Sequence, residues 1–135
     1  MSYVKAMATD IWEDLIIAIL SVNNYSLEKT YSAMQSLRHE GVFDPNNLAS
    51  WTLEEIATRL RRGGYDRGEY LTKLFASRLM SLGMFVEHVG VEECERILTS
   101  GDNTKIGHFL QPIKGVGPQV VTNLLLLGHG SPDIK

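Results

Sequence analysis

The sequence has little cysteine, no excess of positive charge and no long apolar run. Its 135 residues include one cysteine, Cys94, so an internal disulfide is excluded and a reducing, cytoplasmic compartment is expected. The apolar stretch VVTNLLLL is far shorter than the roughly 20 residues that span a bilayer. Because MSYVKAMATD has no basic segment followed by an apolar core, no export signal is predicted.

Charge and size limit the possible partners. The formal net charge is −3, so any contact with nucleic acid must come from a local patch and oriented backbone dipoles. Hydrophobic residues make up 44% of the chain and charged residues 21%, which is typical of a folded globular protein. A chain of this length can bury a core without metal or disulfide, and one domain over residues 1–135 is predicted.

Signatures of metal and cofactor sites are missing. One cysteine cannot provide a four-cysteine iron–sulfur loop, and lone, scattered histidines are usually surface or structural residues. The sequence also has no phosphate-binding Walker loop, no nucleophilic serine elbow and no dinucleotide fingerprint. Neither a metal nor a cofactor is therefore expected.

Apolar residues recur with helical spacing almost everywhere, and no strand alternation or internal repeat is found. The sequence thus predicts an all-α helical bundle. The segment 10–21, with little polar face, is expected to be central, and 41–50 is expected to be a loop. The predicted helices are 10–21, 26–41, 52–63, 67–86, one around 91–98, 102–111 and 118–128.

A glycine-rich bend precedes the last predicted helix in IKGVGPQVVTNLLLL, residues 113–127. Gly115 and Gly117 remove the Cβ barrier to positive φ and let another backbone approach. Amides at the bend and at the start of the helix are unsatisfied donors, which favour an anion such as a nucleic-acid phosphate. Lys114 adds a full positive charge. The alternative is an ordinary helix-to-helix turn whose glycines serve only its geometry.

The stretch FLQPIKGVGPQVVTNLLLL resembles the helix-hairpin-helix of the endonuclease III and alkyl-adenine glycosylase superfamily, with the hairpin at about 104–128. Upstream, DLIIAILSVNNYSLEKTYSAMQSL and LRRGGYDRGEYLTKLFASRLMSLG are similar to that family's first core helix and its glycine-aromatic joint. The resemblance covers roughly residues 10–132. It implies a glycosylase-type helical fold, double-stranded DNA as partner, and base excision repair by flipping a damaged base and cleaving its N-glycosidic bond.

The resemblance also implies roles for individual residues. Asn23 falls where the family often has a glutamine that fills the gap left by the flipped base, although VNNYS also fits a plain turn. The resemblance implies that the hairpin binds DNA through the amides of Gly115, Val116, Gly117, Gln119 and Val120. Lys114 is added to these DNA-binding residues for its charge.

The sequence departs from the family at the catalytic positions. Gln119 stands where bifunctional members carry a nucleophilic lysine, so a monofunctional enzyme is expected. The family's catalytic aspartate is expected near position 137, beyond Lys135. Asp133 is the only carboxylate after the hairpin and lies about one helical turn early, so it is either a weak catalytic candidate or a solvated tail residue. The chain is then either a fragment or a short protein that binds DNA without the chemistry.

Three functions follow from these patterns. The first is a DNA glycosylase domain, the second a non-catalytic DNA-binding module, and the third a helical interaction domain whose hairpin only joins helices. A basic run near the joint either contacts phosphates on the same duplex as the hairpin or is solvated surface charge. This run consists of Arg61, Arg62, Arg67, Lys73 and Arg78.

Overall fold

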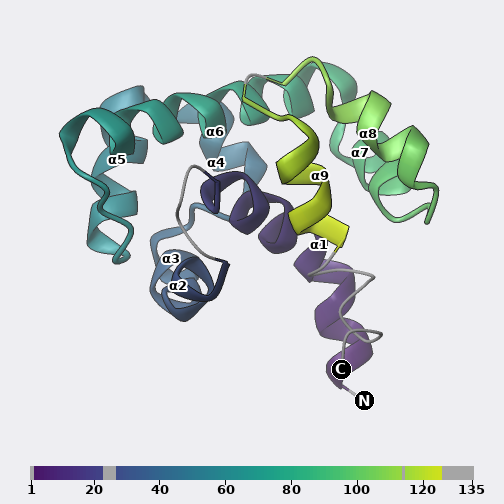
Figure 1. Ribbon diagram of the computed structural model, residues 1–135, viewed down its shortest axis with the longest axis horizontal. Helices are drawn as coiled ribbons and strands as arrows, with labels where there is room; N and C mark the ends of the chain where they lie inside the picture. The colour runs from purple at the N-terminus through teal and green to yellow at the C-terminus, as the bar shows by residue number, and fades with distance from the viewer. Residues whose placement is uncertain (1, 23–26, 114, 126–135) are drawn as a thin grey trace.

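The computed structural model describes residues 2–22, 27–113 and 115–125, with side chains described except at 2–10, 27, 31, 118 and 125. This part of the chain forms nine helices and no strand, which confirms the expected all-α class (Figure 1). The helices are α1 (Ser2–Leu20), α2 (Leu27–Ser32), α3 (Met34–Glu40), α4 (Pro45–Ser50), α5 (Leu53–Arg62), α6 (Glu69–Val89), α7 (Val91–Leu98), α8 (Asn103–Leu110) and α9 (Pro118–Leu125).

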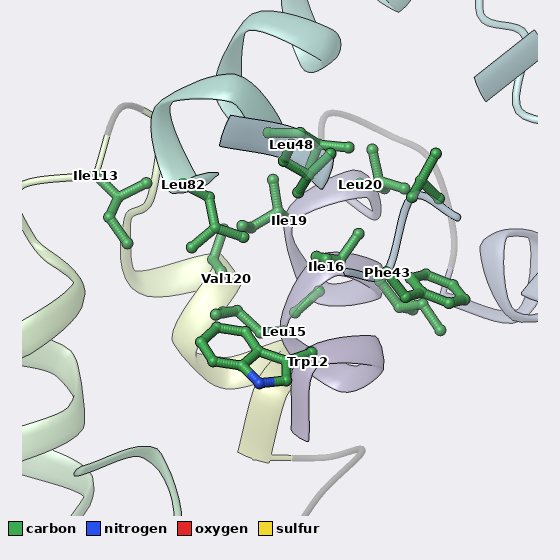
Figure 2. Close-up of a cluster of buried hydrophobic side chains, with 14 of the residues drawn as sticks. Trp12, Leu15, Ile16, Ile19, Leu20, Phe43, Leu48, Leu82, Ile113 and Val120 are labelled. Carbon is green, nitrogen blue, oxygen red and sulfur yellow. The ribbon is translucent and has the colours of Figure 1, made fainter. Parts of the chain in front are cut away.

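The second half of α1 lies at the centre of the core. Every residue from Leu15 to Leu20 is fully buried, so this stretch is apolar on all sides, as expected for a helix surrounded by others. Helices α2, α6 and α9 contact α1. Figure 2 shows α1 side chains together with Leu48 of α4, Leu82 of α6 and Val120 of α9. The predicted central helix is therefore confirmed.

The segment 41–50 was expected to be a loop, and this prediction is wrong because it contains α4. Asp44 and Pro45 start this helix. The Asp44 side chain accepts a hydrogen bond from the amide of Asn46 at 2.9 Å, and proline suits the first helical position. An aspartate before a proline therefore begins a helix here.

Two other helix boundaries differ from the expectation. Helix α1 begins at Ser2 rather than near residue 10. The single helix predicted for 26–41 is split into α2 and α3 at Ala33, whose amide bonds the carbonyl of Thr30 at 3.0 Å in a tighter turn.

Side chains cap the starts of α5 and α8. The hydroxyl of Thr52 accepts from the amide of Glu55 at 3.1 Å, and the carboxylate of Asp102 accepts from the amide of Lys105 at 3.1 Å. The Glu55 side chain does not complete a capping box, because it pairs with Arg59 one turn later.

No single helix in the described part of the chain is long and apolar enough to span a membrane. The consecutive helices α6 and α7 meet that test only as a pair, by length and composition, and they are bent by 106° at their junction.

Helices α4 and α6 pack so closely that a side chain is excluded at Gly83. A Cβ there would lie 2.6 Å from the backbone nitrogen of Ala49 and 2.7 Å from the carbonyl carbon of Leu48. Backbone atoms cannot move away without shifting a whole helix, so the missing side chain at Gly83 sets the distance between the two helices.

We predict that Gly83→Ala lowers the free energy of unfolding by roughly 1–3 kcal/mol, because the added methyl forces the helices apart. The matched control is Gly107→Ala in α8, where a Cβ meets nothing within 4 Å. That change should raise stability by up to about 1 kcal/mol through the better helix propensity of alanine. Thermal unfolding of both variants checks this, and equal melting temperatures would contradict it.

Candidate nucleic-acid interface

The bend between α8 and α9 is a compact turn anchored in the core. The amide of Ile113 donates to the carbonyl of Leu110 at 3.0 Å, and the amide of Val116 donates to the carbonyl of Ile113 at 3.1 Å. The Ile113 side chain is buried, and Figure 2 shows it near Leu82. Gly115 has a φ of 83°, the left-handed region that favours glycine. The bend is therefore held in place by hydrogen bonds and by a buried side chain.

The hydrogen bonds reduce the number of amides that remain open for a ligand. The sequence suggests five open amides, those of Gly115, Val116, Gly117, Gln119 and Val120. In the structure the Val116 amide is used in the turn, and the Val120 amide donates to the carbonyl of Gly117 at 3.0 Å. The side chain of Val120 is buried in the core. The amides of Gly115, Gly117 and Gln119 have no hydrogen-bond acceptor among the described residues. These three are the candidate donors.

The two glycines of the bend differ in their surroundings. A Cβ on Gly115 would overlap the side chain of Arg78, which crosses the bend from α6. A Cβ on Gly117 would meet nothing within 4 Å, and Gly117 is not among the positive-φ glycines. The fold therefore explains the glycine at 115, whereas packing and backbone conformation in the described part of the chain do not require one at 117.

Helix α9 is tied to α1 through Asn123, which is only 3% exposed. Its Nδ2 donates to the carbonyls of Ser21 at 3.0 Å and Ala18 at 3.3 Å, and its Oδ1 accepts from Gln119 Nε2 at 2.9 Å. The Gln119 side chain thus supports a buried hydrogen-bond network. Sequence reasoning missed Asn123; the signal was one amide inside the apolar run VVTNLLLL.

The glycine-aromatic joint between α5 and α6 binds the same end of α1. The Tyr65 hydroxyl donates to the carbonyl of Leu20 at 2.7 Å, and the Arg67 guanidinium donates to that of Val22 at 2.9 Å. Carbonyls at a helix C-terminus lack partners within the helix, and here side chains from distant segments supply them. Residues far apart in sequence therefore converge at the end of α1.

The five basic residues near the joint differ in their surroundings. Arg62 pairs with Glu40 at 3.0 Å, and Lys73 pairs with Glu54 at 3.1 Å, so these charges are partly neutralised. Arg78 is the one that adjoins the bend. Its guanidinium carbon lies 4.8 Å from the centroid of the Phe75 ring. Folding thus brings only part of the run to the candidate interface.

Three predicted site residues, Lys114, Asn23 and Asp133, lie outside the described residues. In the part that is described, no three His, Cys, Asp or Glu side chains are placed to hold a metal ion. Cys94 is buried. Burial and the negative charges of Glu93 and Glu95 raise the pKa of the Cys94 thiol to about 11, so the thiol stays protonated at neutral pH.

A pocket of about 530 Å³ opens elsewhere, lined in part by α1, α3 and the start of α7. Three of its charged side chains already have partners: Arg38 donates to Glu13 at 2.7 Å and 2.9 Å, and Glu95 accepts from Trp12 Nε1 at 2.6 Å. No residue of the bend lines this pocket. It therefore adds nothing to the candidate interface.

Comparison with known protein families, with curated proteins and with solved structures found no match to this chain. The functional argument therefore depends on the chain's own residues and geometry.

We predict that Asn123→Ala lowers the free energy of unfolding by about 1–3 kcal/mol, because buried carbonyls of α1 lose a hydrogen-bond donor. Thr122→Ala, an exposed neighbour on the same helix, should change stability by no more than about 0.5 kcal/mol. Chemical denaturation measures both, and equal effects would show that the tie between α1 and α9 contributes little.

Proposed function

We propose that this chain is a helix-hairpin-helix domain of the DNA glycosylase type, which binds double-stranded DNA and acts in base excision repair. The observation that carries the proposal is Gly117. It combines an amide that has no described acceptor with open space where a side chain would stand. A phosphate oxygen can approach such a position closely, and a side chain would obstruct it.

The place of Gly117 at the start of α9 strengthens this argument. Its carbonyl accepts from the amides of Val120 and Val121, as that of an N-cap residue does. Serine, threonine, aspartate and asparagine usually lead at that position because their side chains cap the helix amides. A glycine leaves those amides and the positive end of the helix dipole to an external anion.

This mode of binding reads the DNA backbone rather than the base sequence. Main-chain amides and a helix N-terminus contact phosphate oxygens, which fix position and carry no direct sequence information. It also suits a chain with net charge −3, because the attraction is local. We expect the protein to be cytoplasmic and associated with the nucleoid when bound.

The proposed chemistry is monofunctional removal of a base. The Gln119 side chain is an amide that donates to Asn123, so it offers no amine to attack the sugar. Cleavage of the N-glycosidic bond needs a carboxylate to stabilise the positive charge that develops on the sugar. Asp133 remains the candidate for that role on this chain.

We predict that Gly117→Asp weakens binding to duplex DNA by at least about tenfold, because placing like charges together costs several kcal/mol. Its melting temperature should not fall, since aspartate is a good N-cap that complements the helix dipole. Gly117→Asn is the matched control, equal in size and capping ability but neutral, and should bind better than the aspartate variant. Fluorescence anisotropy measures binding; equal affinity of all three proteins would contradict this mode of binding.

For the chemistry, we predict that the protein incubated with duplexes carrying a panel of damaged bases leaves abasic sites, which become strand breaks only after alkali. Borohydride should trap no covalent complex, because position 119 carries no amine. Trapping would overturn the monofunctional assignment. If DNA binds but no base is released, the chain is the non-catalytic module, and if no DNA binds, a helical interaction domain is the better description.

A further inference from the structure

Arg78 combines position and charge in a way that the other basic residues near the joint do not. Its aliphatic stem crosses Gly115, close enough to exclude any side chain there. Its guanidinium contacts the Phe75 ring, and it forms no hydrogen bond or ion pair with any described residue. A half-buried cation is thus held beside the bend without a described counterion.

Phe75 gives this guanidinium a fixed support. The Phe75 ring is fully buried and packs edge-on against Tyr65, with the ring centroids 6.1 Å apart. The guanidinium carbon of Arg67 lies 4.9 Å from the centroid of the same ring. A cation over an aromatic ring is attracted to it, so the ring orders the Arg78 side chain before any ligand arrives.

Arg67 and Arg78 share one ring but not one role. The Arg67 guanidinium donates to the carbonyl of Val22 and to the hydroxyl of Tyr65, so it serves the end of α1. The Arg78 guanidinium donates to no described residue, and it adjoins Gly115, whose amide has no described acceptor. An arginine held in this way is suited to bidentate pairing with a phosphate.

We propose that Arg78 pairs with the DNA phosphate at the bend and supplies one salt-dependent ionic contact to it. This inference rests on the proposed function, because it takes duplex DNA as the ligand. The amides fix the position of the phosphate, and Arg78 supplies the charge that displaces counterions from the DNA. A glycine at position 115 then serves two purposes. It adopts the left-handed backbone conformation of the turn, and it leaves room for the Arg78 side chain.

The test compares Arg78→Met with Lys73→Met in the full chain. Methionine keeps an aliphatic stem against Gly115 and Phe75 and removes only the charge. Lys73 lies on the same helix and is paired with Glu54 and Glu69, so its replacement removes an equal charge away from the bend. Binding to one duplex is measured by fluorescence anisotropy over a series of KCl concentrations, and thermal unfolding confirms that both variants fold.

The slope of log affinity against log salt should fall by about 0.9 in Arg78→Met, which is the loss of one phosphate contact on duplex DNA. Affinity at low salt should fall several-fold, while Lys73→Met should match the wild type. Arg78→Lys should restore the slope but only part of the affinity, since it keeps the charge and loses the planar, bidentate group.

Other outcomes overturn the inference in distinguishable ways. If Arg78→Met keeps the wild-type slope while Gly117→Asp still weakens binding as predicted, Arg78 only supports the turn and the DNA-binding function stands. Arg78 is likewise limited to a supporting role if Arg78→Met binds more weakly by a constant factor at every salt concentration. If the wild-type protein shows no salt-dependent binding to duplex DNA, the proposed function fails and this inference fails with it.

Discussion

The C-terminal end of α1 is the point on which the rest of the structure depends. The stretch of this helix from Leu15 to Leu20 is fully buried, so its last carbonyls cannot be satisfied by water and need partners from the protein. Asn123 of α9 and the joint residues Tyr65 and Arg67 provide them. The need for these hydrogen bonds fixes α9, and with it the bend, relative to the joint and α6.

Arg78 and the bend meet because of that arrangement. Helix α6 reaches the core through Phe75 and Leu82, and α9 reaches it through Val120 and Asn123. The two helices thus share α1 as a common support, which brings the stem of Arg78 across Gly115. A proposed contact with DNA phosphate is therefore built on ordinary core packing rather than on a separate structural device.

Local chemistry made much of the helical architecture predictable, and its failures have physical reasons. Apolar spacing identified the central helix, and the predicted ranges 52–63 and 102–111 contain α5 and α8. Helix α4 was missed because aspartate followed by proline is compatible with both a break and a helix start. The amide tie of Asn123 was missed because its partners lie about 100 residues away in sequence.

The sequence by itself determined the all-α class, the central helix, the place of the bend and the need for a left-handed residue within it. Each of these follows from periodicity, propensity or capping among residues a few positions apart. Only the tertiary structure decided which bend amides keep no described acceptor, that Gly117 faces open space and that Arg78 adjoins Gly115. These features depend on which distant side chains reach a given backbone group, and packing of the whole core selects them.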